Sequence, residues 1–162
     1  MGYYHVAQIC LNGDCISDRI DDSEELSQKY CKKCGAKTIT ACPNCNAPIR
    51  GDYETEGIAM LGWEYKVPAF CCECGSPYPW TKNALEAAEQ LIKEDDKLTD
   101  DMKNKVIESL PDIVSETPKT QLAASRFKRA LISAGKFTVD GMRQFAIEFG
   151  CELALIIAGI SQ

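Results

Sequence analysis

The chain has 162 residues, of which 45% are hydrophobic and 26% charged, with a formal net charge of −6 and ten cysteines. This composition predicts one or two small folded domains and excludes a disordered chain. The longest apolar run is far shorter than the roughly 20 residues that span a bilayer, and no signal-peptide pattern opens the chain, so neither a membrane anchor nor export is expected.

The distribution of cysteine divides the chain near residue 80. Every cysteine except Cys151 precedes this point, and the residues after it place apolar side chains at helical spacing. The prolines of SPYPWT (76–81) mark the joint between the two parts. We therefore expect an α+β protein, with tandem zinc ribbons of short antiparallel strands at 1–80 and a helical bundle at 81–162.

The first domain is expected to contain strands that lead into metal-binding turns. Residues 3–9 (YYHVAQI) and 62–70 (GWEYKVPAF) alternate apolar and polar side chains over a few positions, which is typical of half-buried strands. His5 lies in the first of them. We expect it to be a strand residue on a partly exposed face rather than a metal ligand.

Eight cysteines form four pairs with the spacing of metal-binding knuckles. Three pairs are Cys-x-x-Cys followed by Gly35, Asn46 or Gly75, which tolerate the left-handed backbone of such a turn. The fourth pair lies in the looser segment CLNGDC (10–15). Four thiolates surround one tetrahedral zinc, so the sequence predicts two zinc ions per chain. The predicted ligands are Cys10, Cys15, Cys31, Cys34, Cys42, Cys45, Cys71 and Cys74.

The four pairs can be assigned to the two ions in two ways. Sequential pairing joins the first two pairs around one ion and the last two around the other, whereas interleaved pairing gives a cross-brace. We favour sequential pairing because residues 35–41 (GAKTITA) can form one strand between two ribbons, and no helix signal separates the pairs. Closed four-thiolate sites are structural, since catalytic zinc needs an open coordination position.

Two alternatives concern the metal and the remaining thiols. Paired CxxCG knuckles also build rubredoxin sites, so iron is the competing metal. Cys72 could exchange roles with Cys71; otherwise it is a spare thiol and the chemical basis for a thiol-dependent redox enzyme. We find no catalytic constellation in the sequence and name no catalytic residue. Thiols that must stay reduced to hold a metal favour a cytoplasmic location.

Threonines and prolines mark the ends of the expected helices. Thr81 and Thr99 are expected to cap the first two, and Pro111 to end the second. A third helix is expected at 118–134, and Thr138 is expected to cap the fourth.

The last helix carries more apolar surface than packing in a helical bundle requires. Either the zinc-binding half or another subunit is expected to cover it, and we favour a homo-oligomer. The principal apolar stripe of this helix consists of Met142, Phe145, Phe149, Leu153, Ile156 and Ile160.

The charge pattern bears on partners. Residues 1–80 contain seven Lys and Arg against eleven Asp and Glu, and zinc–thiolate centres add negative charge, so nucleic-acid binding by the ribbons is disfavoured. The expected helix at 118–134 is basic and could hold an anion, an acidic partner or a nucleic acid. The alternative is a solvated helix face. The candidate residues are Lys119, Arg126, Lys128 and Arg129.

Three segments resemble the N-terminal signature of a bacterial family of zinc-ribbon proteins: YYHVAQICLNGDCIS (3–17), KYCKKCGAKTITACPNCNAPIRG (29–51) and PAFCCECGSPYPWT (68–81). The resemblance continues more loosely through the helical half. The family brings no established activity, but its paired knuckles are similar to tandem zinc ribbons that act as docking modules. The resemblance thus implies a non-enzymatic binding or adaptor protein that acts through protein contacts.

Overall fold

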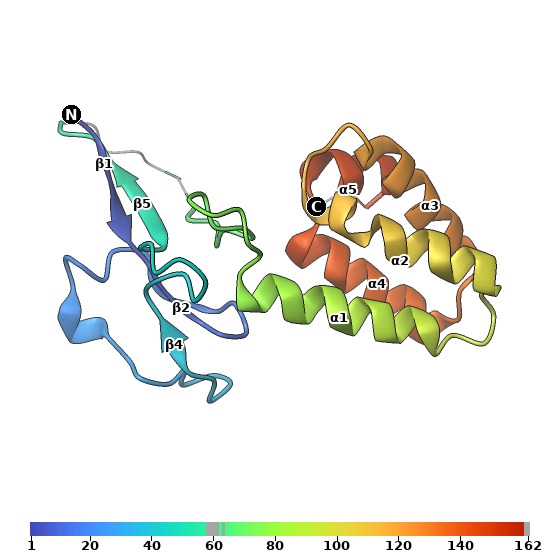
Figure 1. The fold of residues 1–162 in the computed structure, drawn as a ribbon, viewed down its shortest axis with the longest axis horizontal. Coiled ribbons are helices and arrows are strands. Elements are labelled where there is room, and N and C mark those ends of the chain that lie inside the picture. The colour runs from blue at the N-terminus through green and yellow to red at the C-terminus, as the bar shows by residue number, and fades with distance from the viewer. Residues whose placement is uncertain (58–61, 63, 161–162) are drawn as a thin grey trace. The chain divides into compact units, whose positions relative to one another are not determined.

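A computed structural model describes residues 1–57, 62 and 64–160 (Figure 1). The chain divides into two compact units, Met1–Lys82 and Asn83–Gln162. The first unit contains small antiparallel sheets and the second contains helices. The α+β prediction, with strands first and helices second, is confirmed.

Short strands form two antiparallel sheets in the first unit. The antiparallel pair of β1 (Tyr3–Val6) and β5 (Arg50–Glu54) makes one sheet. The other has β2 (Gln8–Cys10) between β3 (Cys15–Ser17) and β4 (Thr38–Ile39). A 3₁₀ turn spans Glu24–Leu26. Strands this short bury little surface of their own, so this unit needs a further source of stability.

Of the two segments predicted to form strands, only the first does so among the described residues. Residues 3–9 are extended, but they belong to two sheets because the chain changes partners at Ala7, whose N–H donates to the Ile49 carbonyl at 2.9 Å. The described residues of 62–70 form no strand, and Phe70 makes only an isolated bridge; Trp63 lies outside the described residues. Pro68 has no N–H for a ladder, and its carbonyl accepts from the Trp80 indole at 2.9 Å.

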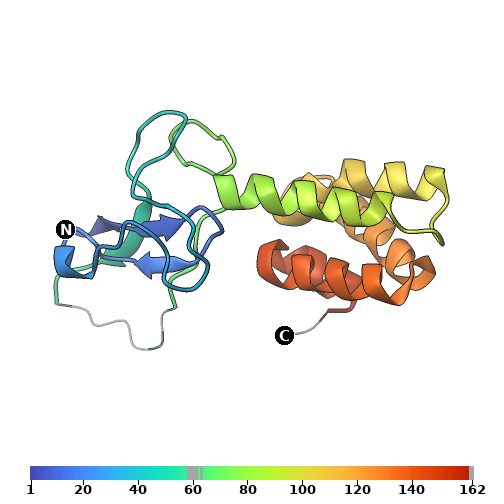
Figure 2. The same ribbon diagram turned by 90° about the horizontal axis from the view of Figure 1, so that it is seen from below.

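The described part of the chain contains five α-helices: α1 (Pro79–Lys93), α2 (Asp100–Val114), α3 (Thr120–Ser133), α4 (Lys136–Phe149) and α5 (Glu152–Ala158). In the second unit α3 packs against α2 and α5 (Figure 1), and Phe127 of α3 is buried. α1 and α4 lie side by side (Figure 2). A Cβ at Gly141 would lie 2.4 Å from Leu91 Cδ2, so glycine permits this close approach. Among the described helices, none has the length and apolarity to cross a membrane.

The helix ends confirm some of the predicted signals and contradict others. Thr99 caps α2 and accepts from the Met102 N–H at 3.3 Å. Thr81 and Thr138 lie inside α1 and α4 instead, and the Thr81 hydroxyl donates to the Ala69 carbonyl at 2.8 Å. Pro111 also lies inside its helix, because it occurs in the last turn, where one lost hydrogen bond disturbs little of the ladder.

The predicted last helix is broken at Gly150, which is extended and ends α4. The next amide, that of Cys151, donates to the Ile113 carbonyl of α2 at 2.7 Å rather than continuing the helix. The apolar residues of the predicted stripe therefore do not form one continuous face: Met142, Phe145 and Phe149 lie in α4, Leu153 and Ile156 lie in α5, and Ile160 follows the end of α5.

Candidate metal centres

The second pair of knuckles brings four thiols together. Cys42, Cys45, Cys71 and Cys74 place their Sγ atoms within 4.8 Å of one another. The Cys42–Cys74 sulfurs are 3.8 Å apart and the Cys45–Cys71 sulfurs 3.6 Å. Zinc–sulfur bonds of about 2.3 Å in a regular tetrahedron separate the sulfurs by about 3.8 Å. This donor set therefore fits a tetrahedral four-thiolate metal ion.

Each Cys-x-x-Cys knuckle has the same backbone hydrogen bonds. In the turn at 31–36, the Gly35 N–H donates to the Cys31 carbonyl and the Cys31 N–H to the Ala36 carbonyl, both at 2.8 Å. The turns that begin at Cys42 and Cys71 repeat the pattern. The residue after the second cysteine has a positive φ in all three turns, at Gly35, Asn46 and Gly75. The residue types that predicted the turns therefore also explain their geometry.

The first centre contains three thiols and a carboxylate. Cys10, Cys31 and Cys34 gather with Asp14. The Cys10–Cys34 sulfurs are 3.7 Å apart, and Asp14 Oδ2 lies 3.6 Å from Cys10 Sγ and 3.7 Å from Cys31 Sγ. A tetrahedral zinc with one oxygen ligand at about 2.1 Å gives sulfur–oxygen edges of about 3.6 Å. These four donors also fit a metal ion.

The structure does not bring Cys15 into this group, and the predicted ligand set differs here. The turn after Cys10 is one residue shorter than the other knuckles, because Gly13 N–H donates to the Cys10 carbonyl and Cys10 N–H to the Asp14 carbonyl, both at 2.9 Å. Cys15 is the first residue of β3, and adjacent residues of a strand point to opposite faces. Asp14 consequently faces the other ligands, while Cys15 is exposed.

The pairing of the knuckles is sequential in the structure. Cys10 meets the pair at 31–34, and the pair at 42–45 meets the pair at 71–74, so the cross-brace alternative does not describe this fold. Within the last knuckle Cys71 is buried among the ligands. Cys72 is exposed, and its Sγ lies 3.7 Å from Oε1 of the neighbouring Glu73.

Two asparagines that the sequence analysis did not select contact the thiols. The Asn12 side-chain amide donates to Cys34 Sγ, and the Asn44 amide donates to Cys74 Sγ, both at 3.4 Å. Each asparagine lies two residues after the first cysteine of its centre, and this repeated Cys-x-Asn spacing is the signal that could have found them. Such donors stabilise negative charge on a metal-bound sulfur and fix its orientation.

Hydrogen bonds favour the thiolate form of the last cysteine of each centre. The Ser76 and Asn44 side chains lower the pKa of Cys74 to about 6. The Ala36 amide and the Asn12 side chain lower the pKa of Cys34. Burial instead raises the pKa of Cys10 to about 11. Because the thiolate is the metal ligand, a metal ion that binds the first centre must displace the proton of Cys10.

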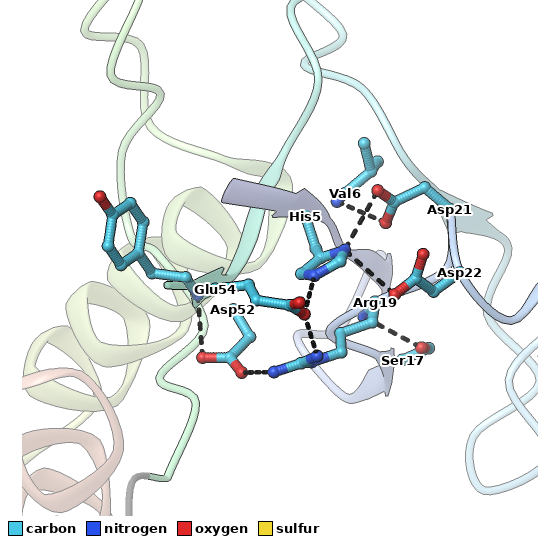
Figure 3. A network of polar contacts seen from close by, with 9 residues as sticks. His5, Val6, Ser17, Arg19, Asp21, Asp22, Asp52 and Glu54 are labelled. Atoms are coloured by element: carbon cyan, nitrogen blue, oxygen red, sulfur yellow. Dashed lines mark hydrogen bonds and ion pairs between the residues drawn. The ribbon is translucent and has the colours of Figure 1, made fainter. Parts of the chain in front are cut away.

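A third cluster surrounds His5 (Figure 3). The prediction of a partly exposed histidine is wrong, since the residue is only 1% exposed. Its Nε2 lies 3.0 Å from Glu54 Oε2 and its Nδ1 lies 3.2 Å from Asp21 Oδ2. Arg19 donates to Glu54 at 2.7 Å and to Asp52 at 2.6 Å. Arg19 pairs with Glu54 and Asp52, and the His5 imidazole pairs with Glu54, Asp21 and Asp22, so these contacts form an ion-pair network. His5, Asp22 and Glu54 also lie close enough together to hold a metal ion.

The network predicts a pH-dependent contribution to stability. Burial alone would lower the pKa of His5, but hydrogen bonds to Glu54 and Asp21 and the nearby charge of Asp22 outweigh it and raise the pKa. Because the pKa of His5 is higher in the folded than in the unfolded state, its contribution to the free energy of unfolding is fully present below the unfolded-state pKa of about 6.5. This contribution is lost as the pH rises through the folded-state pKa. Between the two values the loss is about 1.4 kcal/mol per pH unit.

We therefore expect the guanidinium chloride concentration at the midpoint of unfolding of the first unit, measured with zinc present, to decrease as the pH is raised above about 6.5. In the His5→Gln variant the part of this decrease that is due to His5 should be absent, although the variant is expected to be less stable at every pH. The pH dependence of metal binding is common to both proteins, so the difference between the two curves reports His5. Parallel curves would contradict an imidazolium at this position.

The basic residues of the helical unit do not form one free patch. Lys119, Lys128 and Arg129 are exposed, but Arg126 is partly buried and donates to Ser109 Oγ of α2 at 3.2 Å. Arg126 therefore takes part in packing between α2 and α3. The exposed cations remain open to an anion.

Comparison with known proteins places the chain in a family without assigning it an activity. No curated protein and no solved structure matches it. Residues 3–156 match the family described as "Uncharacterized protein conserved in bacteria (DUF2321)", and this match includes all the ligands of both centres and most of the helical unit. The chain belongs to this bacterial family.

Proposed function

We propose that the first unit is a tandem zinc-ribbon module in which two structural zinc ions shape a surface for docking to another protein. The observation that carries this proposal is the four-thiolate group of Cys42, Cys45, Cys71 and Cys74, whose sulfur separations of 3.6 and 3.8 Å are those of a tetrahedral zinc site. Four protein ligands leave no open position for a substrate or a catalytic water. A cytoplasmic location suits such thiols.

Metal content tests this proposal directly. Protein purified without chelator from cells supplied with zinc should carry two zinc ions per chain in native mass spectrometry. Iron in the four-thiolate site would support the rubredoxin-like alternative, and its ferric form would show thiolate-to-iron absorption that zinc cannot give. Protein that folds normally with no bound metal would contradict the proposal.

An aromatic strip on the β1–β5 sheet supports the docking role. Tyr4 pairs with Tyr53 across the strands, with ring centroids 4.8 Å apart, and the Arg50 guanidinium lies 4.9 Å from the centroid of Tyr4. Tyr4 is 52% exposed and Tyr53 38%. Tyrosine and arginine are enriched at the energetic centres of protein interfaces.

We expect the double variant Tyr4→Ser/Tyr53→Ser to lose its protein partners while it keeps both zinc ions. Tyr30→Ser is a matched control, because Tyr30 is also exposed, at 63%, but lies outside this sheet. Crosslinking in the native bacterium followed by mass spectrometry would compare the captured proteins. Equal capture by the two variants would argue against the strip as the docking surface.

A further inference from the structure

The two centres are built alike except for one ligand. Each begins with a buried cysteine followed two residues later by an asparagine, and each ends with a Cys-x-x-Cys knuckle whose last sulfur accepts from that asparagine. Each also has one exposed cysteine in this final knuckle, Cys34 or Cys74. The difference is that Asp14 occupies the place that Cys45 has in the second centre.

Asp14 is a weaker anchor for zinc than a thiolate. A carboxylate oxygen is a harder donor than a thiolate sulfur, and thiolates are the ligands that select zinc. The charge of Asp14 is also shared, because its second oxygen, Oδ1, accepts from the Lys33 ammonium at 2.6 Å. The side chains of Asp14 and Lys33 are 27% and 77% exposed, so water and solutes can reach this pair.

We propose that the first centre is an exchangeable zinc site, which gives its ion to a competing multidentate ligand while the second centre keeps its own. This inference rests on the proposed binding of zinc at both centres. In the exchange the donor atoms of the acceptor, such as thiols or imidazoles, replace the four protein ligands one after another, beginning at the bond to Asp14 Oδ2. The released thiolates of Cys10, Cys31 and Cys34 take up protons that the acceptor's donors lose when they bind zinc. The carboxylate then remains paired with Lys33, and no oxidation or reduction is involved.

The test follows zinc loss from the full-length protein. Protein loaded with two zinc ions is mixed with excess EDTA and sampled over time by native mass spectrometry. We expect two phases of one ion each, with the first faster by on the order of tenfold or more, the scale on which changes around a zinc site shift its affinity. Circular dichroism recorded in parallel reports whether the chain stays folded after the first ion leaves.

Reciprocal ligand exchanges assign the phases. Asp14→Cys should slow the fast phase until the two ions leave together, and Cys45→Asp should make both ions leave quickly. Cys15→Ser should behave as the unsubstituted protein does. The inference would be overturned if the two ions left the unsubstituted protein at one rate. It would also be overturned if Asp14→Cys left the fast phase unchanged while Cys15→Ser altered it. Either result would leave the proposed function intact. A chain that binds no zinc would overturn both.

Discussion

Removal of both zinc ions with excess EDTA is expected to unfold residues 1–82 and to leave residues 83–162 helical. The first unit has short strands, and its buried hydrophobic residues include the ligand cysteines Cys10, Cys31, Cys42 and Cys71, so its core is built around the metal centres. Structural zinc contributes on the order of 10 kcal/mol to the folding of small domains, which is as large as the whole stability of a typical protein. The helical unit has a core of its own around Phe127 and Met142.

Hydrogen exchange measured by mass spectrometry would separate the two units within one chain. Peptides from the first unit should lose their protection in EDTA, and peptides from α2 and α3 should keep it, which makes the second unit an internal control. Renewed protection after zinc is restored would show that the unfolding is due to the metal. Full protection of peptides around Cys42 and Cys71 in protein shown to be free of metal would contradict this prediction.

Substitution of two adjacent cysteines is expected to have very different effects. Cys71→Ser removes a buried sulfur that lies 3.6 Å from Cys45 Sγ, so the chain should hold one zinc ion fewer and the second ribbon should unfold. Cys72→Ser changes an exposed thiol outside the ligand group and should preserve both ions. The expected loss of stability from Cys71→Ser is several kcal/mol, as for other losses of a metal site.

Native mass spectrometry and thermal unfolding of the two variants check this difference. The same pair decides whether Cys72 can take over from Cys71, because an exchange of roles would leave Cys71→Ser with both ions. The rate of alkylation of Cys72 is a further measurement. A rate no faster than that of an unfolded control would remove the thiol-dependent enzyme as an alternative.

The knuckles could be predicted from the sequence because local residue types determine them. Gly35, Asn46 and Gly75 occupy the positive-φ positions, and the short spacing between cysteines leaves little freedom. The identity of the ligand at 14–15 could not be predicted in this way. It depends on whether the turn after Cys10 has the length of a knuckle or of a tighter hairpin, and hydrogen bonds between Cys10 and Gly13 decide this only in the folded chain.

Helix signals were reliable where they acted locally and failed where tertiary contacts competed with them. Thr99 caps α2 through its own hydroxyl. Thr81 has the same side chain, but its hydroxyl donates to the carbonyl of Ala69, just before the last knuckle. The break at Gly150 likewise depends on the contact of Cys151 with Ile113, which lies far away in the sequence. No periodicity argument includes such partners.

Sequential pairing of the knuckles also has a consequence for synthesis on the ribosome. The first centre closes over 24 residues, from Cys10 to Cys34, and the second over 32 residues, from Cys42 to Cys74. All ligands of the first ribbon have therefore been translated before any ligand of the second. Short loop closures cost little entropy, and nascent chains fold from the N-terminus. Each ribbon can acquire its ion as it emerges, without competition from the thiols of the other.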